Sequence, residues 1–374
     1  MKTNNNLEEI MKYHLQKYPE MELSDMVKLI YQNEWGGGHL IEDANRSLLY
    51  IQEEMRQSQL DIHSEFSEDI GNGVSRIYLS AFRQLFSDEI LALHILNQLF
   101  VTGATFAKGN LLSFKEKLQI FQNLCKTNFF LEKNPNQHWA EQQMQLSKFL
   151  QSYADEGYPM MRHSQHYREE YKPAYRIVSN GFASYIPLFQ KIETLLQNKE
   201  RVVIGIDGRC GSGKTTLADI LHNVFDCSLI RMDDFFLPPN LRTAERLNQA
   251  GANVHHERFQ DEVLRPLKES IDFSYRTFDC SIMNYADEPK KVEIKPLTII
   301  EGSYSMRPEF LECYDLKIFM DIADDFQKER IINRNGAERY KMFEQKWIPM
   351  ENKYFESFQV KQTCDEIFFA HKTL

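Results

Sequence analysis

The sequence predicts a mostly α-helical N-terminal domain followed by an α/β domain with a parallel sheet flanked by helices. In the first half, apolar residues recur at helical spacing, as in the stretches 23–35 and 76–101. From residue 201 onward, short apolar runs such as RVVIGID and LTIIEG alternate with helical segments, a pattern typical of parallel α/β folds. The length of 374 residues also favours two domains. The expected parts are a helical domain over 1–180, a linker helix over 181–199 and the α/β domain over 200–374.

Composition narrows the functional classes. Hydrophobic residues make up 42% and charged residues 26%, as in ordinary globular proteins. The net charge is −10 and both halves are acidic, which argues against nucleic acid or an anionic membrane as the main partner. The six cysteines form no zinc-type cluster, and no apolar run suits a signal peptide or a membrane span. We expect a cytoplasmic protein whose oligomeric state stays open, a homodimer included.

Residues 208–215, GRCGSGKT, match the phosphate-binding pattern GxxxxGK[ST] without a gap. An apolar strand precedes them and a helical pattern follows, as a P-loop NTPase fold requires. Lys214 would reach the β- and γ-phosphates, and the hydroxyl of Thr215 would coordinate Mg²⁺. ATP and Mg²⁺ are therefore the expected cofactors. The predicted nucleotide-binding residues are Gly208, Cys210, Gly211, Ser212, Gly213, Lys214, Thr215 and Thr216.

The next apolar run, CSLIRM, leads directly into the turn Asp233-Asp234-Phe235-Phe236. A carboxylate at the end of a strand beside the phosphate loop is well placed to accept a proton from a hydroxyl. With this loop and turn, the second half resembles the uridine kinase/phosphoribulokinase family. The resemblance implies a nucleoside-kinase-like fold and transfer of phosphate from ATP to a small-molecule hydroxyl, with Asp233 as the base or as the residue that orients the acceptor. The alternative is that both aspartates only shape the turn.

Two later features agree with the resemblance. LTIIEG ends in Glu301, and the resemblance implies that this carboxylate lies near the metal or the acceptor, although a structural role stays open. Arg330 and Arg334 share one face of a predicted helix. In the resembling kinases an arginine-bearing lid closes over the transferred phosphate, which arginine suits because its fork binds phosphate oxygens. The alternative is a solvated helix face.

The acceptor itself is not fixed by the sequence. The family has an acceptor-binding insertion, commonly with an Asn and an Asp two residues later, whereas here Asn253 is followed by His255. This departure leaves uridine open against another small metabolite. The substrate-site candidates are Asp234, Asn253, His255, Arg258 and Tyr304.

Two runs in the first half also qualify as a candidate site. Three adjacent glycines precede His39, and a run rich in Tyr, Arg and His begins at Arg162. They could bind an anionic or sugar-like ligand, or form a tight turn and a packing arm. The candidates are Gly37, His39, His163, Tyr167 and Arg168.

A small-molecule kinase is the leading functional hypothesis. The alternatives are a nucleotide-dependent switch, a binding module derived from a kinase, and a bifunctional protein whose first domain carries a second activity. The chain lacks the NKxD motif by which GTPases read the base, and it retains Lys214, Thr215, Asp233 and Glu301. These features favour the kinase.

Overall fold

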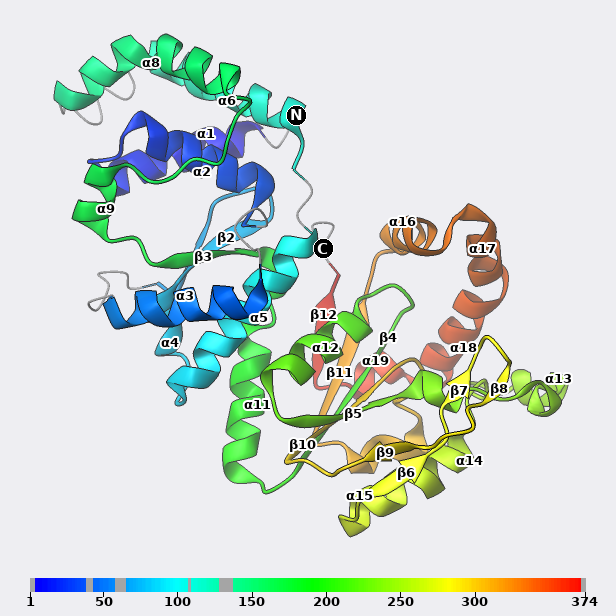
Figure 1. Ribbon diagram of the computed structural model, residues 1–374. Helices are drawn as coiled ribbons and strands as arrows, with labels where there is room; N and C mark the ends of the chain where they lie inside the picture. The colour runs from blue at the N-terminus through cyan, green and yellow to red at the C-terminus, as the bar shows by residue number, and fades with distance from the viewer. Residues whose placement is uncertain (1–3, 38–42, 58–64, 107–108, 128–136, 371–374) are drawn as a thin grey trace. The chain divides into compact units, whose positions relative to one another are not determined.

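The computed structural model describes residues 4–37, 43–57, 65–106, 109–127 and 137–370. The chain divides at Pro187 into two compact units, and each has its own arrangement of helices and strands (Figure 1). Within the described ranges, no helix has the length and apolarity needed to cross a lipid bilayer.

A five-stranded, fully parallel sheet forms the centre of the second unit, and helices flank it (Figure 1). The strand order is β12-β11-β4-β10-β5. Both the sheet and the flanking helices confirm the predicted α/β class. The strands are β4 (Val202–Gly208), β5 (Cys227–Arg231), β10 (Leu297–Glu301), β11 (Leu316–Asp321) and β12 (Glu366–Phe369).

The central strands are apolar because both faces of the sheet are covered. Every residue of β10 is buried, and β4 is buried at all but one position. The helices of this unit are α11 (Ile186–Asn198), α12 (Lys214–Val224), α13 (Ala244–Leu247), α14 (His256–Phe259), α15 (Arg265–Glu269), α16 (Asp324–Asn335), α17 (Ala337–Met342), α18 (Ile348–Phe358) and α19 (Val360–Thr363).

Two short antiparallel hairpins lie between β5 and β10 in the chain. One pairs β6 (Phe273–Tyr275) with β9 (Lys290–Val292), and the other pairs β7 (Phe278–Asp279) with β8 (Asn284–Tyr285). The sequence between the DDFF turn and β10 therefore folds into a substantial insertion beside the phosphate loop.

The first unit is mostly helical, as expected. Its core joins α1, α2, α6 and α8 through residues such as Met26, Ile30, Phe114 and Phe121, which are fully buried. Its helices are α1 (Asn4–Lys17), α2 (Leu23–Trp35), α3 (Ala44–Gln57), α4 (Leu79–Arg83), α5 (Glu89–Phe106), α6 (Leu111–Lys126), α8 (Gln137–Asp155), α9 (Gln165–Tyr171) and α10 (Asn180–Ala183).

The prediction of a helix over residues 76–101 was wrong for the first residues of that range. Strand β2 (Val74–Tyr78) lies there, between β1 (Ser67–Asp69) and β3 (Tyr175–Ser179) in an antiparallel sheet. The side chain of Arg76 within β2 is completely buried. A buried arginine removes the apolar–polar alternation by which a half-buried strand is recognised in sequence.

Candidate active site

The phosphate loop runs from the end of β4 to the start of α12. Gly208 and Gly213 adopt positive φ values of 140° and 104°. A Cβ on Gly208 would lie 2.1 Å from the carbonyl oxygen of Met320 on β11, so only glycine fits this close approach of two strands. The loop thus opens at the carboxyl edge of the sheet, where parallel α/β folds bind ligands.

Lys214 holds the loop in shape. Its buried ammonium group donates to the carbonyl oxygens of Gly208, at 2.7 Å, and of Arg209, at 3.1 Å. Its charge is therefore fixed inside the turn that would surround phosphates. Ser212 is also buried, and among the described residues its hydroxyl has no hydrogen-bond partner.

Thr215 and Glu301 meet beside the loop. The Thr215 hydroxyl donates to Oε1 of Glu301 at 3.1 Å, and Arg231 contacts Oε2 at 3.3 Å. Glu301 is buried, which raises the pKa of its carboxyl; Lys214 opposes the rise and Asp233 reinforces it. A hydroxyl and a carboxylate are hard oxygen ligands, and Mg²⁺ is commonly held by one or two such groups together with phosphates. This pair therefore fits the expected ion, although the described residues contain no cluster of three or more metal-ligating side chains.

The two aspartates of the DDFF turn have different surroundings. Asp234 accepts from the hydroxyl of Tyr275 at 2.9 Å and lies 3.6 Å from Nζ of Lys290. Among the described residues, none donates a hydrogen bond to the carboxylate of Asp233. Asp233 is open to solvent, yet the surrounding protein raises its pKa, with Lys214 opposing and Asp234 reinforcing the rise. Because solvent screens an exposed carboxylate, we expect this rise to be modest.

Both predicted lid arginines contact the phosphate loop from α16. Nη1 of Arg330 donates to the carbonyl oxygen of Gly211 at 3.0 Å. Nη2 of Arg334 lies 3.7 Å from Sγ of Cys210. The structure therefore brings the two cations to the loop, where a terminal phosphate would need neutralisation.

The acceptor candidates lie on a segment that pairs with the DDFF turn. The backbone N–H of His255 donates to the carbonyl of Phe235 at 2.7 Å, and that of Leu237 donates to the carbonyl of Asn253 at 3.2 Å. Asn253 is buried, and its side-chain oxygen has no hydrogen-bond partner among the described residues. This pairing carries Asn253 and His255 alongside the turn that contains Asp233.

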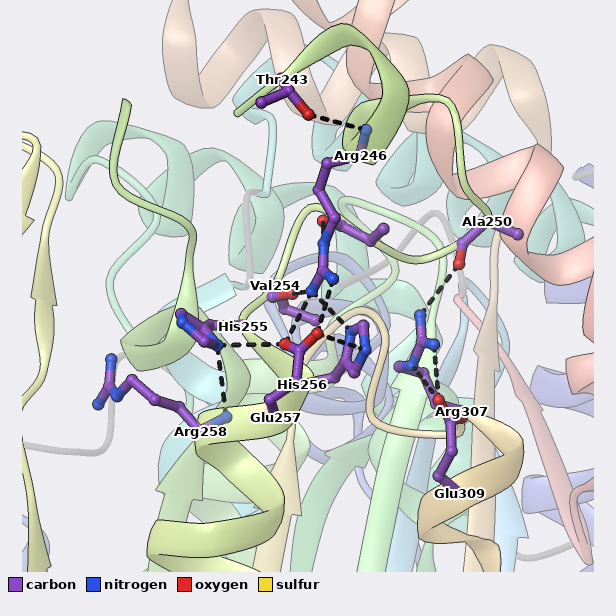
Figure 2. Close-up of polar contacts among 11 residues, drawn as sticks. Thr243, Arg246, Ala250, Val254, His255, His256, Glu257, Arg258, Arg307 and Glu309 are labelled. Atoms are coloured by element: carbon purple, nitrogen blue, oxygen red, sulfur yellow. Dashed lines mark hydrogen bonds and ion pairs between the residues drawn. The ribbon is translucent and has the colours of Figure 1, made fainter. Parts of the chain in front are cut away.

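A network of charged side chains braces that segment (Figure 2). Arg246 forms two bonds to the carboxylate of Glu257, at 2.7 and 2.9 Å, and a third to Nδ1 of His256 at 2.9 Å. Nearby, Arg307 donates to the carbonyl of Ala250 at 3.0 Å. The network fixes the backbone on both sides of Asn253.

Two other candidates are held by neighbouring side chains. Arg258 forms two bonds to Glu262, at 2.7 and 2.8 Å, and its guanidinium lies over the rings of Phe235 and Tyr285. The buried ring of Tyr304 packs edge-on against Tyr354. These contacts give both residues a structural role in addition to any contact with substrate.

Three further side chains at the phosphate loop were not among the residues predicted from the sequence. Glu351 on α18 accepts the backbone N–H of Cys210 at 2.9 Å and the hydroxyl of Ser303 at 2.7 Å. Asp207 lies under the loop, accepts from Tyr354 at 2.8 Å, and has its pKa raised by burial to about 6. Gln327 donates to the carbonyl of Cys210 at 2.9 Å. Only the strand ending VVIGID could have indicated one of them, Asp207.

The N-terminal candidates are only partly brought together. His163 stacks on Tyr167 with ring centroids 4.3 Å apart, and both side chains are buried. Arg168 is exposed and donates to the carbonyl of Ser164 at 3.3 Å. Gly37 packs close to the ring of Phe100, and His39 lies outside the described residues.

The loop, the strand order and the carboxylates at the strand ends define a P-loop kinase type of domain. The model of the phosphoribulokinase/uridine kinase family matches residues 203–348. A uridine kinase of Clostridium botulinum (strain Okra) is 30% identical over 149 residues, which cover 38% of this chain and 72% of the relative. A uridine kinase of Ligilactobacillus salivarius is 31% identical over 156 residues, with the same two coverages. The chain belongs to the phosphoribulokinase/uridine kinase family.

Among solved structures, a possible uridine kinase from Bacillus stearothermophilus matches 49% of this chain and 99% of its own length. The sequence identity is 20% and the TM-score is 0.37.

Proposed function

We propose that this protein is an ATP- and Mg²⁺-dependent kinase that transfers the γ-phosphoryl group to a hydroxyl of a small molecule. A nucleoside such as uridine is one acceptor class and another small metabolite is the alternative. The main support for the proposal is that three sets of side chains lie at the same edge of the parallel sheet. They are the phosphate loop with Lys214, the Thr215–Glu301 pair, and the Asp233 carboxylate without a hydrogen-bond donor among the described residues.

In the proposed reaction, the acceptor oxygen forms a bond to the γ-phosphorus while the bond from phosphorus to the β–γ bridging oxygen breaks. Asp233 receives the hydroxyl proton, and ADP leaves with the bridging oxygen. Thr215 and Glu301 would hold Mg²⁺, which neutralises phosphate charge when bound. Arg330 and Arg334 would stabilise the charge of the transferred group. Catalysis would consist mainly of positioning and charge stabilisation.

The Asn253–His255 segment supports an acceptor pocket beside Asp233. The side-chain oxygen of Asn253, which accepts no hydrogen bond from the described residues, is a buried acceptor that a substrate hydroxyl or N–H could satisfy. Burial lowers the pKa of His255, so its ring is mostly neutral at pH 7 and offers both a donor and an acceptor. Neutral polar groups suit an uncharged acceptor such as a nucleoside or sugar.

The test is Asp233→Asn in the full chain. Wild-type protein is first screened for Mg²⁺- and ATP-dependent phosphorylation of nucleosides, sugars, vitamins and amino acids. Loss of the proton acceptor should then lower kcat for the active acceptor about 10²- to 10⁴-fold. ATP binding, measured by calorimetry, should persist because Asp233 does not hold the phosphates.

The matched control is Asp287→Asn, which neutralises an exposed aspartate of the insertion and should leave kcat unchanged. A nucleotide-dependent switch would behave differently: Asp233→Asn would keep its nucleotide-dependent change, and no acceptor of the panel would be phosphorylated. That result would refute the kinase proposal.

A further inference from the structure

The first unit contains a cavity of ≈ 400 Å³ that the proposed kinase reaction does not use. It runs along β3, the edge strand of the three-stranded sheet, and α2, α3 and α5 supply further lining residues. Every described residue that lines it belongs to this unit. The volume lies within the range of small-molecule sites.

Two cationic side chains that form no ion pair within the described residues lie on one side of the cavity. Lys28 of α2 lines the cavity, and its ammonium group donates to the carbonyl of Met161 at 3.3 Å. Behind the wall lies Arg76, completely buried, which donates to Oε1 of Gln32 at 3.0 Å and lies over the ring of Tyr175 at 4.7 Å. Among the residues described, no carboxylate lies within ion-pair distance of Lys28 or Arg76.

This arrangement is electrostatically costly. Burial, together with the charge of Arg76, lowers the pKa of Lys28 to about 8, so the amine is still mostly protonated at pH 7. Two cations that repel each other in a poorly solvated place need an anion nearby. Asp25 and Glu68 offset part of this repulsion from a distance, but in the described part of the chain neither carboxylate forms an ion pair with Lys28 or Arg76.

Three carboxylates at or near the cavity are bonded to other partners. Glu54 pairs with Arg176 at 2.7 Å, and Asp43 accepts the backbone N–H of Asn45 at the start of α3. Asp25 accepts four hydrogen bonds at 2.7 to 3.0 Å, two of them from Ser164. These bonds hold the three carboxylates in place, so none of them forms an ion pair with Lys28, and Asp25 acts on Lys28 only from a distance.

A rigid polar wall stands beside the cations. Burial lowers the pKa of His163 to about 4, so the ring is neutral at pH 7. Its Nδ1–H then donates to Asp25 at 2.7 Å, and its Nε2 accepts from the hydroxyl of Tyr175 at 2.6 Å. Gln32 donates in turn to that hydroxyl at 3.1 Å. The network holds Tyr175 and Gln32, both of which line the cavity, in fixed orientations.

We propose that this cavity binds a small organic anion, with its phosphate or carboxylate group against Lys28 and its uncharged part along β3. The anion supplies the ion-pair partner that Lys28 lacks among the described residues. Of the N-terminal candidates that the structure describes, only His163 lines this site. Phe100 and Tyr50 provide apolar surface for the remainder of the ligand.

The experiment uses the full chain carrying Lys214→Ala, which weakens anion binding at the phosphate loop. Thermal unfolding and calorimetry are recorded with inorganic phosphate, ribose 5-phosphate and citrate, and with ribose as the uncharged control. At least one anion should raise the melting temperature at millimolar concentration, while ribose should not. A response to the phosphates alone or to citrate alone identifies the anionic group.

Two variants and one control test whether the anion binds in this cavity. Lys28→Gln should weaken the anion's affinity roughly ten- to hundredfold, as expected for loss of a hydrogen bond to a charged group. Lys148→Gln, at an exposed lysine of α8, is the matched control and should change nothing. Gln32→Glu places a carboxylate beside Arg76, so it should raise the melting temperature without ligand and abolish the response to the anion.

Two results would overturn the proposal. One is the absence of any stabilisation by the three anions beyond that given by ribose. The other is a stabilising anion whose affinity is unchanged in both Lys28→Gln and Gln32→Glu, since that anion binds elsewhere. Neither result bears on phosphoryl transfer, which is measured at Asp233 in the second unit.

Discussion

Glu351 places a buried carboxylate against the phosphate loop, where it accepts from the backbone of Cys210. A bound triphosphate would bring several negative charges close to it, and like charges in a partly desolvated site repel strongly. We expect Glu351→Gln to lower the KM for ATP severalfold, because the amide oxygen can keep the bond to Cys210 without the charge. Steady-state kinetics at varied ATP concentration measures this.

Glu356→Gln on the exposed side of the same helix is the control, and its KM should match the wild type. A higher KM in Glu351→Gln would show that the carboxylate shapes the loop more than it repels the nucleotide.

Glu301 is the second residue with a specific expectation. If it holds the metal together with Thr215, Glu301→Gln should raise the Mg²⁺ concentration needed for half-maximal activity by roughly tenfold or more, because an amide is a weaker ligand than a carboxylate. Titration of activity with Mg²⁺ at saturating ATP measures the shift. Glu293→Gln, at an exposed position before β10, should leave the titration unchanged. If the Mg²⁺ titration of Glu301→Gln matches that of the wild type, Glu301 does not bind the metal. Its role is then limited to its contacts with Thr215 and Arg231.

At the scale of single elements, α16 holds the two arginines that we propose to close over the transferred phosphate. Arg330 reaches the carbonyl of Gly211, so it lies close to the loop in this structure. Arg330→Gln should lower kcat about 10²- to 10³-fold, the usual loss when a transition-state donor is removed. The melting temperature should change little. Lys328→Gln, an exposed cation on the same helix, is the control for charge. Equal losses in the two variants would contradict a specific role for Arg330.

The elements that the sequence predicts well are those whose signals are local. Each of these signals lies within a few consecutive residues. They are the apolar runs of β4 and β10, the glycine pattern between residues 208 and 213, and the DDFF turn. Strand β2 does not, because buried Arg76 reads as a surface residue. Contacts made across the fold leave no local pattern either, which is why Glu351, 141 residues beyond its partner Cys210, was missed.

At the scale of the whole molecule, two buried histidines make stability depend on pH. Burial lowers the pKa of His14 to about 3 and that of His163 to about 4, from an ordinary value of 6.5. Between these values the unfolded chain binds protons that the folded chain does not. Stability is therefore complete above pH 6.5 and falls as the pH drops toward 4.

Thermal unfolding at pH 7, 6 and 5 should show a progressive fall in the melting temperature of the first unit. His14→Gln should flatten that dependence, since one of the two groups no longer titrates. His166→Gln serves as a contrast because His166 is exposed and its pKa is raised by Glu20, so its removal should not flatten the fall. A melting temperature that is constant from pH 7 to 5 would contradict the neutral, buried state of both rings.

The bond from Tyr354 to Asp207 ties α18 to the strand that leads into the phosphate loop. Asp207 is fully buried beneath the phosphate loop, and the hydroxyl that Tyr354 donates to it comes from α18. A shortened gene product ending before Tyr354 would lose that donor and the ring that fills the space above it. Removal of the segment that begins at Tyr354, as in a truncated expression variant, would thus disturb the phosphate loop 140 residues earlier in the sequence.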